Sequence, residues 1–347
     1  MKKLLILLLL CLPLTVRAQA AEFTAPSVPE AGAQYMPQEQ DSFGSALYSM
    51  VRTVLRGLQP NLREAARSAL GVFAGVLAVS ILGPVQEKNS LGLRMVLTLA
   101  VSAALLGSAH AMIRLGTRTV GQMSDYGRLL LPVMAAALAA QGGLTSSAAL
   151  YTGTAVFDAV LGRLISGLLC PMVYLFLALA VANSAIGEGM LKKLRDLLKT
   201  FMSWCLKTIL TVFTTYMSIT GVVSGTTDAA ALKATKVTIS SMVPMVGSIL
   251  SDASEAVLVS AGVMKNAAGV YGILAMLAIF LSPFLQIGVQ YLVLKATAAV
   301  CSVFAPPSAA ELIEDFSTAM GMLLAMTGAA CLLLLISTVC FMKGARG

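Results

Sequence analysis

Most of the chain consists of long, nearly uncharged apolar runs separated by short polar stretches. A transmembrane helix needs about 20 such residues, and seven runs approach or exceed this length. They cover residues 70–86, 91–113, 164–186, 201–223, 237–263, 267–294 and 319–342. The runs are continuous and do not alternate in polarity, so they predict helices and not the strands of a transmembrane barrel. The pattern predicts an all-α, polytopic integral membrane protein with about seven transmembrane helices.

Residues 129–162 interrupt this regular pattern. An apolar run at 129–140 is only about half the length of a span, the polar stretch 141–147 contains Gly142 and Gly143, and a second short run covers 148–161. We predict a broken or re-entrant segment here, which is stable at membrane depth only when it is buried in protein or lines a wet cavity. Two short, tilted helices are the alternative.

Two stretches have the apolar and basic faces of a helix that lies in the membrane interface. The first is 46–69, which is interrupted at Pro60, and the second is 188–200, where leucines share one face. Positive residues on the second stretch predict a cytoplasmic membrane surface. These candidate membrane-surface residues are Lys192, Lys193, Arg195 and Lys199.

The N-terminus has the features of a secretory signal peptide. Lys2 and Lys3 precede a short apolar core, and Ala18-Gln19-Ala20 fits a small-residue cleavage site. An uncleaved anchor is the alternative, and cleavage would place the mature N-terminus outside the cytoplasm. We therefore divide the chain into a signal peptide (1–20), a flexible polar leader (21–45), amphipathic interfacial helices (46–69) and a polytopic transmembrane domain (70–347).

Composition supports the membrane assignment and excludes several other classes. Apolar residues make up 58% of the chain and charged residues 12%, which is about half the share found in soluble domains. The net charge of +8 is explained by Lys and Arg facing anionic lipid at the ends of spans. Basic stretches are not interleaved with aromatic residues, so we expect a lipid partner and no nucleic acid.

The sequence contains no recognisable catalytic or metal-binding motif. There is one histidine, the six cysteines form no CxxC pair, and the P-loop, HExxH and GxSxG patterns are absent. We therefore predict a non-enzymatic protein with no catalytic residues, no cofactor and no metal. An intramembrane enzyme is the least favoured hypothesis.

The run at 237–266 is unusually polar for a membrane span. Asp252 and Glu255 are three residues apart and share one helical face, while Pro244 and Gly247 predict a kink. Ionisable groups inside a membrane are costly, so each is a candidate for function, although pairing as structural glue is equally consistent with the pattern. The candidate functional or packing residues are Pro244, Gly247, Ser251, Asp252, Glu255, Lys265 and Asn266.

The stretch 232–272 resembles the stage III sporulation protein AE family of endospore-forming bacteria. The matching features are a lysine pair, a Val-Pro-Met-Val-Gly turn, a Ser-Asp-Ala triplet and a Lys-Asn pair. They lie at Lys233 and Lys236, at 243–247, at 251–253, and at Lys265 and Asn266. The stretch from Leu131-Pro132 to Gly142-Gly143, the basic helix at 190–200 and the order of parts are similar as well.

This resemblance implies a role that composition does not reveal. It implies a multi-pass subunit in the mother-cell membrane, within a channel complex that faces the forespore and resembles specialised secretion systems. The implied partners are other stage III sporulation membrane proteins, and the chain could also form a homo-oligomer. The broken segments, with Asp252 and Glu255, leave a secondary transporter or permease for a small solute or ion as the alternative function.

Seven crossings also predict a topology. With the mature N-terminus outside, the basic helix at 188–200 and the C-terminal tail lie on the cytoplasmic side. The acidic helix at 308–318 then lies on the opposite side of the membrane.

Overall fold

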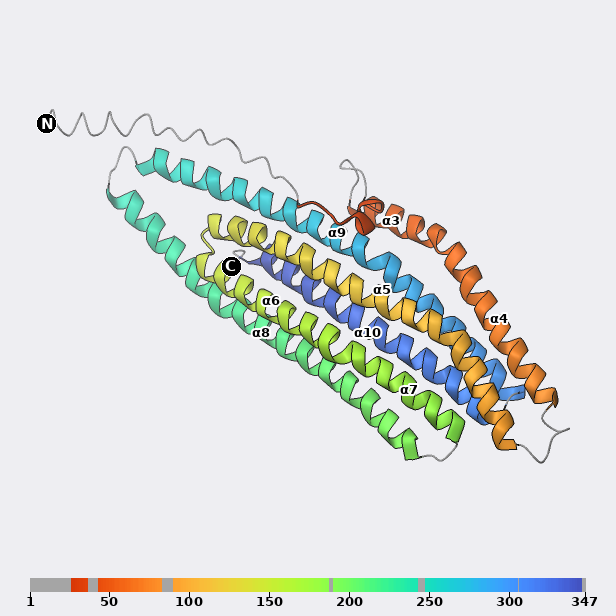
Figure 1. The fold of residues 1–347 in the computed structure, drawn as a ribbon. Helices are drawn as coiled ribbons and strands as arrows, with labels where there is room; N and C mark the ends of the chain where they lie inside the picture. The colour runs from red at the N-terminus through yellow and green to blue at the C-terminus, as the bar shows by residue number, and fades with distance from the viewer. Residues whose placement is uncertain are drawn as a thin grey trace.

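The computed structural model describes residues 26–36, 43–82, 90–186, 190–242, 247–304 and 306–344. Every regular element in these ranges is a helix, and long helices run side by side along one elongated bundle (Figure 1). The four longest helices are α5 (Ser90–Ala140), α8 (Met190–Met242), α9 (Gly247–Phe304) and α10 (Pro307–Lys343). The remaining bundle helices are α6 (Leu144–Leu164) and α7 (Cys170–Ile186), which the π-helical turn η3 (Ile165–Leu169) joins into one rod.

The structure confirms the all-α polytopic class but differs from the expected number of spans. Five segments of the described chain are long and apolar enough to cross a membrane. They are Met95–Ala140, Leu144–Ile186, Leu191–Thr220, Lys265–Phe304 and Pro307–Lys343. The expected runs at 91–113 and 129–140 are both parts of α5. Of the run 237–263, residues 237–242 end α8, and residues 247–263 are continuous with 267–294 in α9.

The predicted re-entrant segment at 129–162 is wrong, and so is the alternative of two short helices. Pro132 lies inside α5 without ending it, because a proline removes only one hydrogen bond of the helical ladder. The chain reverses at Gly142, whose φ of 88° is the left-handed conformation that favours glycine. The Gly142 N–H donates to Ala139 O and the Gly143 N–H donates to Leu138 O, which is the Schellman arrangement that closes a helix.

The helices are much longer than a bilayer is thick. The 51 residues of α5 extend about 76 Å at 1.5 Å per residue, whereas the hydrocarbon core is about 30 Å thick. A tilt of 40°, the upper end of the usual range, still leaves a rise of about 58 Å. Part of each long helix therefore lies outside the hydrocarbon, which explains why charged residues interrupt the apolar runs without breaking the helices.

A proline also explains the π-helical turn between α6 and α7. Pro171 has no N–H and its ring would clash with the carbonyl four residues earlier in an α-helix. In the turn before it, the Cys170 N–H donates to Ile165 O, five residues back. This wider turn gives the proline room, so the two helices continue as one rod.

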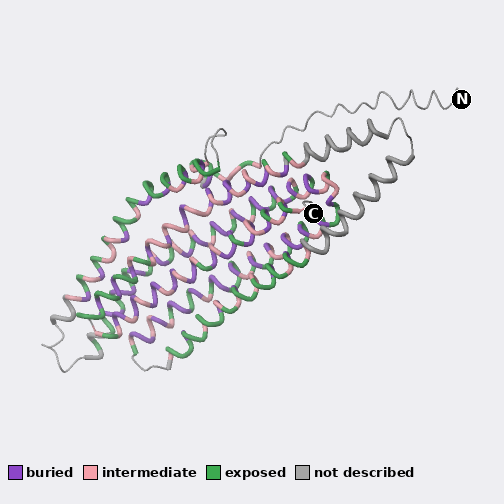
Figure 2. The backbone as a smooth tube through the Cα atoms, turned by 180° about the vertical axis from the view of Figure 1, so that it is seen from behind, coloured by how far each residue is buried: buried purple, intermediate pink, exposed green. Residues whose placement is uncertain are grey.

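α10 is the central helix, since it contacts α5, α6, α7, α8 and α9. Its side chains are buried along most of its length, whereas α8 has a largely exposed outer face (Figure 2). Hydroxyl groups connect the helices inside the apolar core. Thr154 Oγ1 donates to Ser337 Oγ at 2.9 Å, and Ser124 Oγ donates to Asp158 Oδ2 at 2.5 Å. Such bonds hold helices together where lipid offers no hydrophobic driving force for their association.

Part of the predicted flexible leader is folded onto the bundle. The short helix α2 (Glu30–Ala33) packs on α9, and a Cβ added at Gly32 would lie 3.1 Å from the Ile279 backbone nitrogen. Tyr35 donates a hydrogen bond of 3.2 Å to Ser282 Oγ, beside Pro283 of α9. The expected signal peptide, residues 1–20, lies outside the described residues.

The predicted interfacial stretch 46–69 is divided between two helices. α3 (Phe43–Gly57) buries Ala46 and Met50 against Leu274 and Ala278 of α9, so it packs on protein along one face. α4 (Gln59–Leu82) begins beside the predicted break at Pro60 and continues into the expected first span. The boundary expected at residue 69 is therefore not a helix boundary.

Two glycines of α6 give a test of the close packing between α6 and α8. A Cβ at Gly153 would overlap the ring of Tyr216, whose hydroxyl donates to Ala149 O at 3.0 Å, whereas a Cβ at Gly162 would meet nothing within 4 Å. We expect Gly153→Ala to lower the free energy of unfolding by about 1–3 kcal/mol through overpacking. Gly162→Ala should be neutral or stabilising by up to about 1 kcal/mol. Reversible SDS titration of both variants in detergent micelles measures the difference, and equal stabilities would contradict this packing.

Candidate functional site

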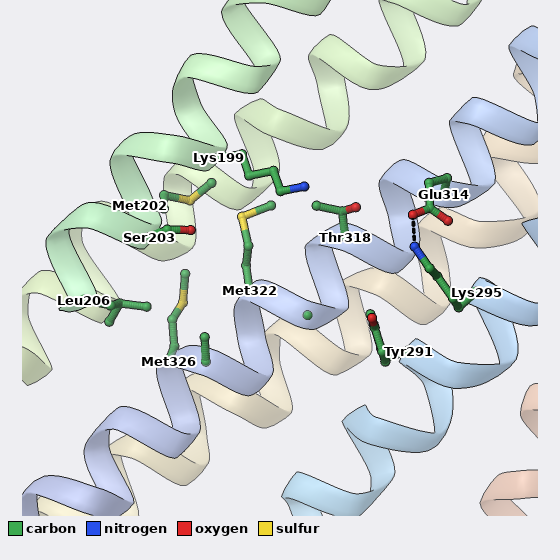
Figure 3. A pocket seen from close by; sticks show the side chains of 12 residues that line it. Lys199, Met202, Ser203, Leu206, Tyr291, Lys295, Glu314, Thr318, Met322 and Met326 are labelled. Atoms are coloured by element: carbon green, nitrogen blue, oxygen red, sulfur yellow. Dashed lines mark hydrogen bonds and ion pairs between the residues drawn. The ribbon is translucent and has the colours of Figure 1, made fainter.

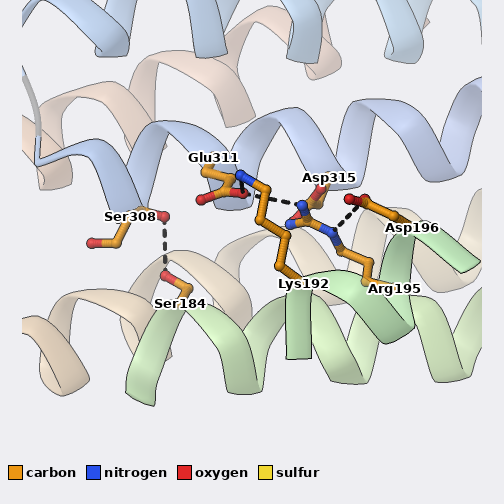
Figure 4. Close-up of polar contacts among 7 residues, drawn as sticks. All are labelled: Ser184, Lys192, Arg195, Asp196, Ser308, Glu311 and Asp315. Atoms are coloured by element: carbon orange, nitrogen blue, oxygen red, sulfur yellow. Dashed lines mark hydrogen bonds and ion pairs between the residues drawn. The ribbon is translucent and has the colours of Figure 1, made fainter. Parts of the chain in front are cut away.

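An ion-paired cluster joins the first turns of α8 and α10 (Figure 4). Lys192 and Arg195 are three residues apart on α8, and Glu311 and Asp315 are four residues apart on α10. These spacings put each pair on one face of its helix, so two positive groups face two negative groups across the helix contact. Asp196 approaches the cluster from the next position of α8.

Arg195 is the centre of this cluster and is 5% exposed. Its Nη2 lies 3.0 Å from Glu311 Oε1, its Nη1 pairs with Asp315 Oδ2, and its Nε lies 3.5 Å from Asp196 Oδ1. Lys192 Nζ also lies 3.0 Å from Glu311 Oε1. A planar guanidinium can satisfy several carboxylates at once, which a lysine ammonium in the same place could not do with this geometry. The Arg195–Asp315 pair is almost fully desolvated, so loss of either partner would leave an uncompensated buried charge.

Serine and threonine hydroxyls tie three helix ends together next to the ion pairs. Ser184 Oγ, near the end of α7, donates to the Ser308 carbonyl at 3.0 Å, at the start of α10. The same hydroxyl lies 3.1 Å from Thr98 Oγ1 of α5. The starts of α8 and α10 and the end of α7 are therefore held at one end of the bundle.

Two cavities flank the first part of α10. One of about 470 Å³ lies beside the ion pairs and is lined by Asn183, Ser184, Lys192, Ser308, Glu311 and Asp315, among others. The other, of about 260 Å³, lies on a different side of α10 (Figure 3). Lys199 lines it together with the ion pair between Lys295 Nζ and Glu314 Oε1. Charged side chains thus surround both hollows at this end of the molecule.

The structure separates the predicted candidate residues into two groups at opposite ends of the bundle. Lys192 and Arg195 belong to the ion-paired cluster, Lys199 lines the smaller cavity, and Lys193 is exposed. Lys265 lies near the other end, where it is buried and its Nζ donates to Gly344 O at 2.6 Å. This contact ties α9 to the end of α10.

The remaining candidates of the polar run are described only in part or not at all. Asn266 follows Lys265 in α9 and is partly exposed. Pro244 lies outside the described residues. Four more have a described helical backbone in α9, but their side chains are not described: Gly247, Ser251, Asp252 and Glu255. Their predicted roles stay predictions.

The predicted topology is wrong on one point that the ion pairs decide. The basic segment at 188–200 and the acidic segment at 308–318 are in direct contact, so they cannot lie on opposite sides of a membrane. The C-terminal end of α10 lies at the other end of the bundle (Figure 1). The count of seven spans treats 237–263 and 267–294 as two separate crossings, so the chain returns to the same side of the membrane after them. In the structure, residues 247–304 form the single helix α9, which crosses once.

The pairing itself was missed, although the sequence contained a sign of it. Basic residues at i and i+3 and acidic residues at i and i+4 form complementary faces of similar length. The sequence predicts a separate short acidic helix at 308–318, and a count of seven crossings places it on the far side of the membrane. Only the correct number of membrane crossings places the basic face of α8 and the acidic face of α10 on the same side of the membrane.

An all-α bundle with five potential spans, polar interhelical bonds and no described soluble domain defines a polytopic membrane protein. Comparison with known proteins gives the family. The family model described as stage III sporulation protein AE matches residues 86–344. This range contains all of the helices from α5 to α10. The chain belongs to this family of sporulation proteins.

One curated relative supports this assignment. The chain is 25% identical to the stage III sporulation protein AE of Bacillus subtilis (strain 168) over 195 residues, which is 56% of this chain. The match spans 49% of the relative, or about half of its length. No solved structure matches the chain.

The buried ion pair gives a prediction with an internal control. We expect Arg195→Met to lower the free energy of unfolding by about 3–5 kcal/mol, because the Asp315 carboxylate stays buried without its partner. The double variant Arg195→Met with Asp315→Leu should recover much of this loss, since no unpaired charge remains. Lys193→Met, on the exposed face of the same turn, should change stability by less than about 0.5 kcal/mol. Denaturant titration in micelles tests the series, and equal effects at positions 193 and 195 would contradict the cluster.

Proposed function

We propose that the chain is a non-enzymatic membrane subunit of the channel complex that connects the mother cell with the forespore during endospore formation. The observation that carries this proposal is the family match over residues 86–344, because it covers the folded bundle and not only a local motif. The family defines a sporulation role, and the channel complex is the specific form that we propose for it.

The length of the helices supports a role in an assembly. A bundle that rises well beyond the hydrocarbon offers rigid helical surfaces outside the bilayer, where other proteins can bind. Its outer surface also keeps large apolar side chains exposed, including Phe201 and Trp204 of α8. Lipid or neighbouring subunits can cover such a face, and other stage III sporulation membrane proteins are the partners that we propose.

The proposed location follows from the same role. The chain would lie in the mother-cell membrane that faces the forespore, with the mature N-terminus outside the cytoplasm. In this arrangement, the parts of the bundle beyond the hydrocarbon are accessible from the two compartments that the membrane separates.

Gene deletion in the spore-forming host tests the proposal. We expect development to arrest after engulfment and heat-resistant spore counts to fall by several orders of magnitude, because a subunit without a substitute would be missing. Plasmid-borne wild-type protein and Lys193→Met should restore spore formation. Arg195→Met should restore it poorly, in proportion to its lower level in the membrane, which immunoblotting measures.

Normal spore counts in the deletion strain would refute the proposed role. The transporter alternative predicts a different result in vitro, because the purified chain alone should then move a solute into liposomes. Uptake by the single protein, together with sporulation that fails only in medium where that solute is limiting, would favour the alternative.

A further inference from the structure

A third cavity lies between α4, α5 and α9, and its lining residues do not belong to the ion-paired cluster. Its volume of about 430 Å³ falls within the range of about 300–1,000 Å³ that is typical of small-molecule pockets. On each helix the lining positions recur three or four residues apart, so each helix contributes one face. α5 contributes the short residues Ala104, Gly107 and Ala111, which leave the space between the helices open.

All three helices place polar side chains in the wall of this cavity. Two of these side chains come from the apolar segment Lys265–Phe304 of α9, where a polar group is costly and is therefore a candidate for function. Among their contacts with described residues there is one side-chain hydrogen bond, from Gln286 Nε2 to Ser282 Oγ at 3.2 Å. The polar lining residues are Asn61, Glu64, Ser68, Ser108, Gln286 and Gln290.

Gln290 is the most informative of these residues, because it is only 7% exposed. It lines the cavity, and its side chain makes no hydrogen bond to any described residue. Its amide atoms are not among the fully enclosed atoms without a partner, so they keep access to the cavity. An amide carries an acceptor oxygen and a donor NH₂ group, and native proteins rarely leave either unsatisfied when it is buried. A molecule that completes this site has to donate and accept hydrogen bonds at adjacent atoms.

The charges of the wall exclude other kinds of ligand. No Lys or Arg lines the cavity, so an anion has no charged partner there. Glu64 is the one charged side chain of the wall and is exposed, so its charge is solvated without a counter-ion. An ammonium group only donates, and it would leave the NH₂ group of Gln290 without an acceptor. Hydroxyl groups both donate and accept, and two adjacent hydroxyls match the oxygen and the nitrogen of one amide.

We propose that this cavity binds a small neutral polyol, which is a molecule with adjacent hydroxyl groups such as a monosaccharide. One hydroxyl donates to Gln290 Oε1, and its neighbour accepts from Gln290 Nε2. A further hydroxyl donates to the Glu64 carboxylate on the exposed side of the cavity. The inference concerns the isolated protein and does not depend on the channel complex.

Binding to the purified full chain in phosphatidylcholine nanodiscs tests the proposal. The protein is prepared without glycoside detergents, because their headgroups carry the proposed chemistry. Saturation-transfer NMR detects weak binding of D-glucose and myo-inositol, and empty nanodiscs give the background. Methylammonium, which only donates, and 1,4-dioxane, a six-membered ring that only accepts, serve as controls. The two polyols should give a signal above background, and the two controls should not.

Three variants assign the signal to this cavity. Gln290→Leu keeps the size of the side chain and should weaken binding about tenfold or more. The melting temperature of its ligand-free form should stay equal or rise, because an unpaired buried amide is removed. Gly107→Leu should abolish binding by filling the cavity, since a Cβ at Gly107 meets nothing within 4 Å. Gly121 of α5 also has open space but does not line the cavity, so Gly121→Leu should bind as the wild type does.

Three results would overturn the proposal. The first is the absence of any polyol signal above that of empty nanodiscs, which would leave the cavity to water. The second is binding of methylammonium or dioxane as strong as that of the polyols. The third is unchanged polyol binding in either Gln290→Leu or Gly107→Leu.

Discussion

The contact of the Arg195 guanidinium with Glu311 and Asp315 fixes the arrangement of this bundle at one end. Nonpolar packing alone can let long helices slide or rotate, because many registers bury similar areas. A buried arginine with two carboxylates admits few alternatives, since a shift of one turn would leave charges unpaired in a desolvated place. The contact therefore specifies which end of α8 lies beside which end of α10, and the turns between the helices follow from it.

Helix continuity is the second property on which the architecture depends. Inside a bilayer every backbone N–H and C=O needs a partner, and a helix provides it without help from other segments. The long helices keep this property beyond the hydrocarbon, so the molecule is a rod of helices that lie side by side, with the ion-paired cluster at one end. The cavity at the α7–α8 and α9–α10 end lies where three helix termini meet, and termini are the places where backbone groups are left free for other molecules.

The helical class and the membrane location could be predicted from the sequence because both depend on average hydrophobicity over long windows. The number of spans could not, since the charged residues Arg114, Arg118 and Lys265 interrupt the apolar runs in the sequence, whereas α5 and α9 continue through them. The sequence correctly places a break of the helical pattern at Gly142. In the structure this glycine closes the long helix α5, and no re-entrant segment is formed there.

The same difference explains why the candidate site could be predicted only in part. Lys192 and Arg195 were singled out as basic residues, and lipid was the partner expected from their amphipathic helix. Their observed partners are more than a hundred residues away in the sequence, so only the correct order of crossings brings them together.

The most direct test of this account is the sidedness of three positions in the membrane. Cysteines placed singly at Lys193, Glu314 and Lys343, in a background without native cysteines, would be labelled with a membrane-impermeant maleimide in sealed vesicles of known orientation. The account predicts that positions 193 and 314 are labelled from the same side and position 343 from the other. Labelling of positions 193 and 314 from opposite sides would contradict it.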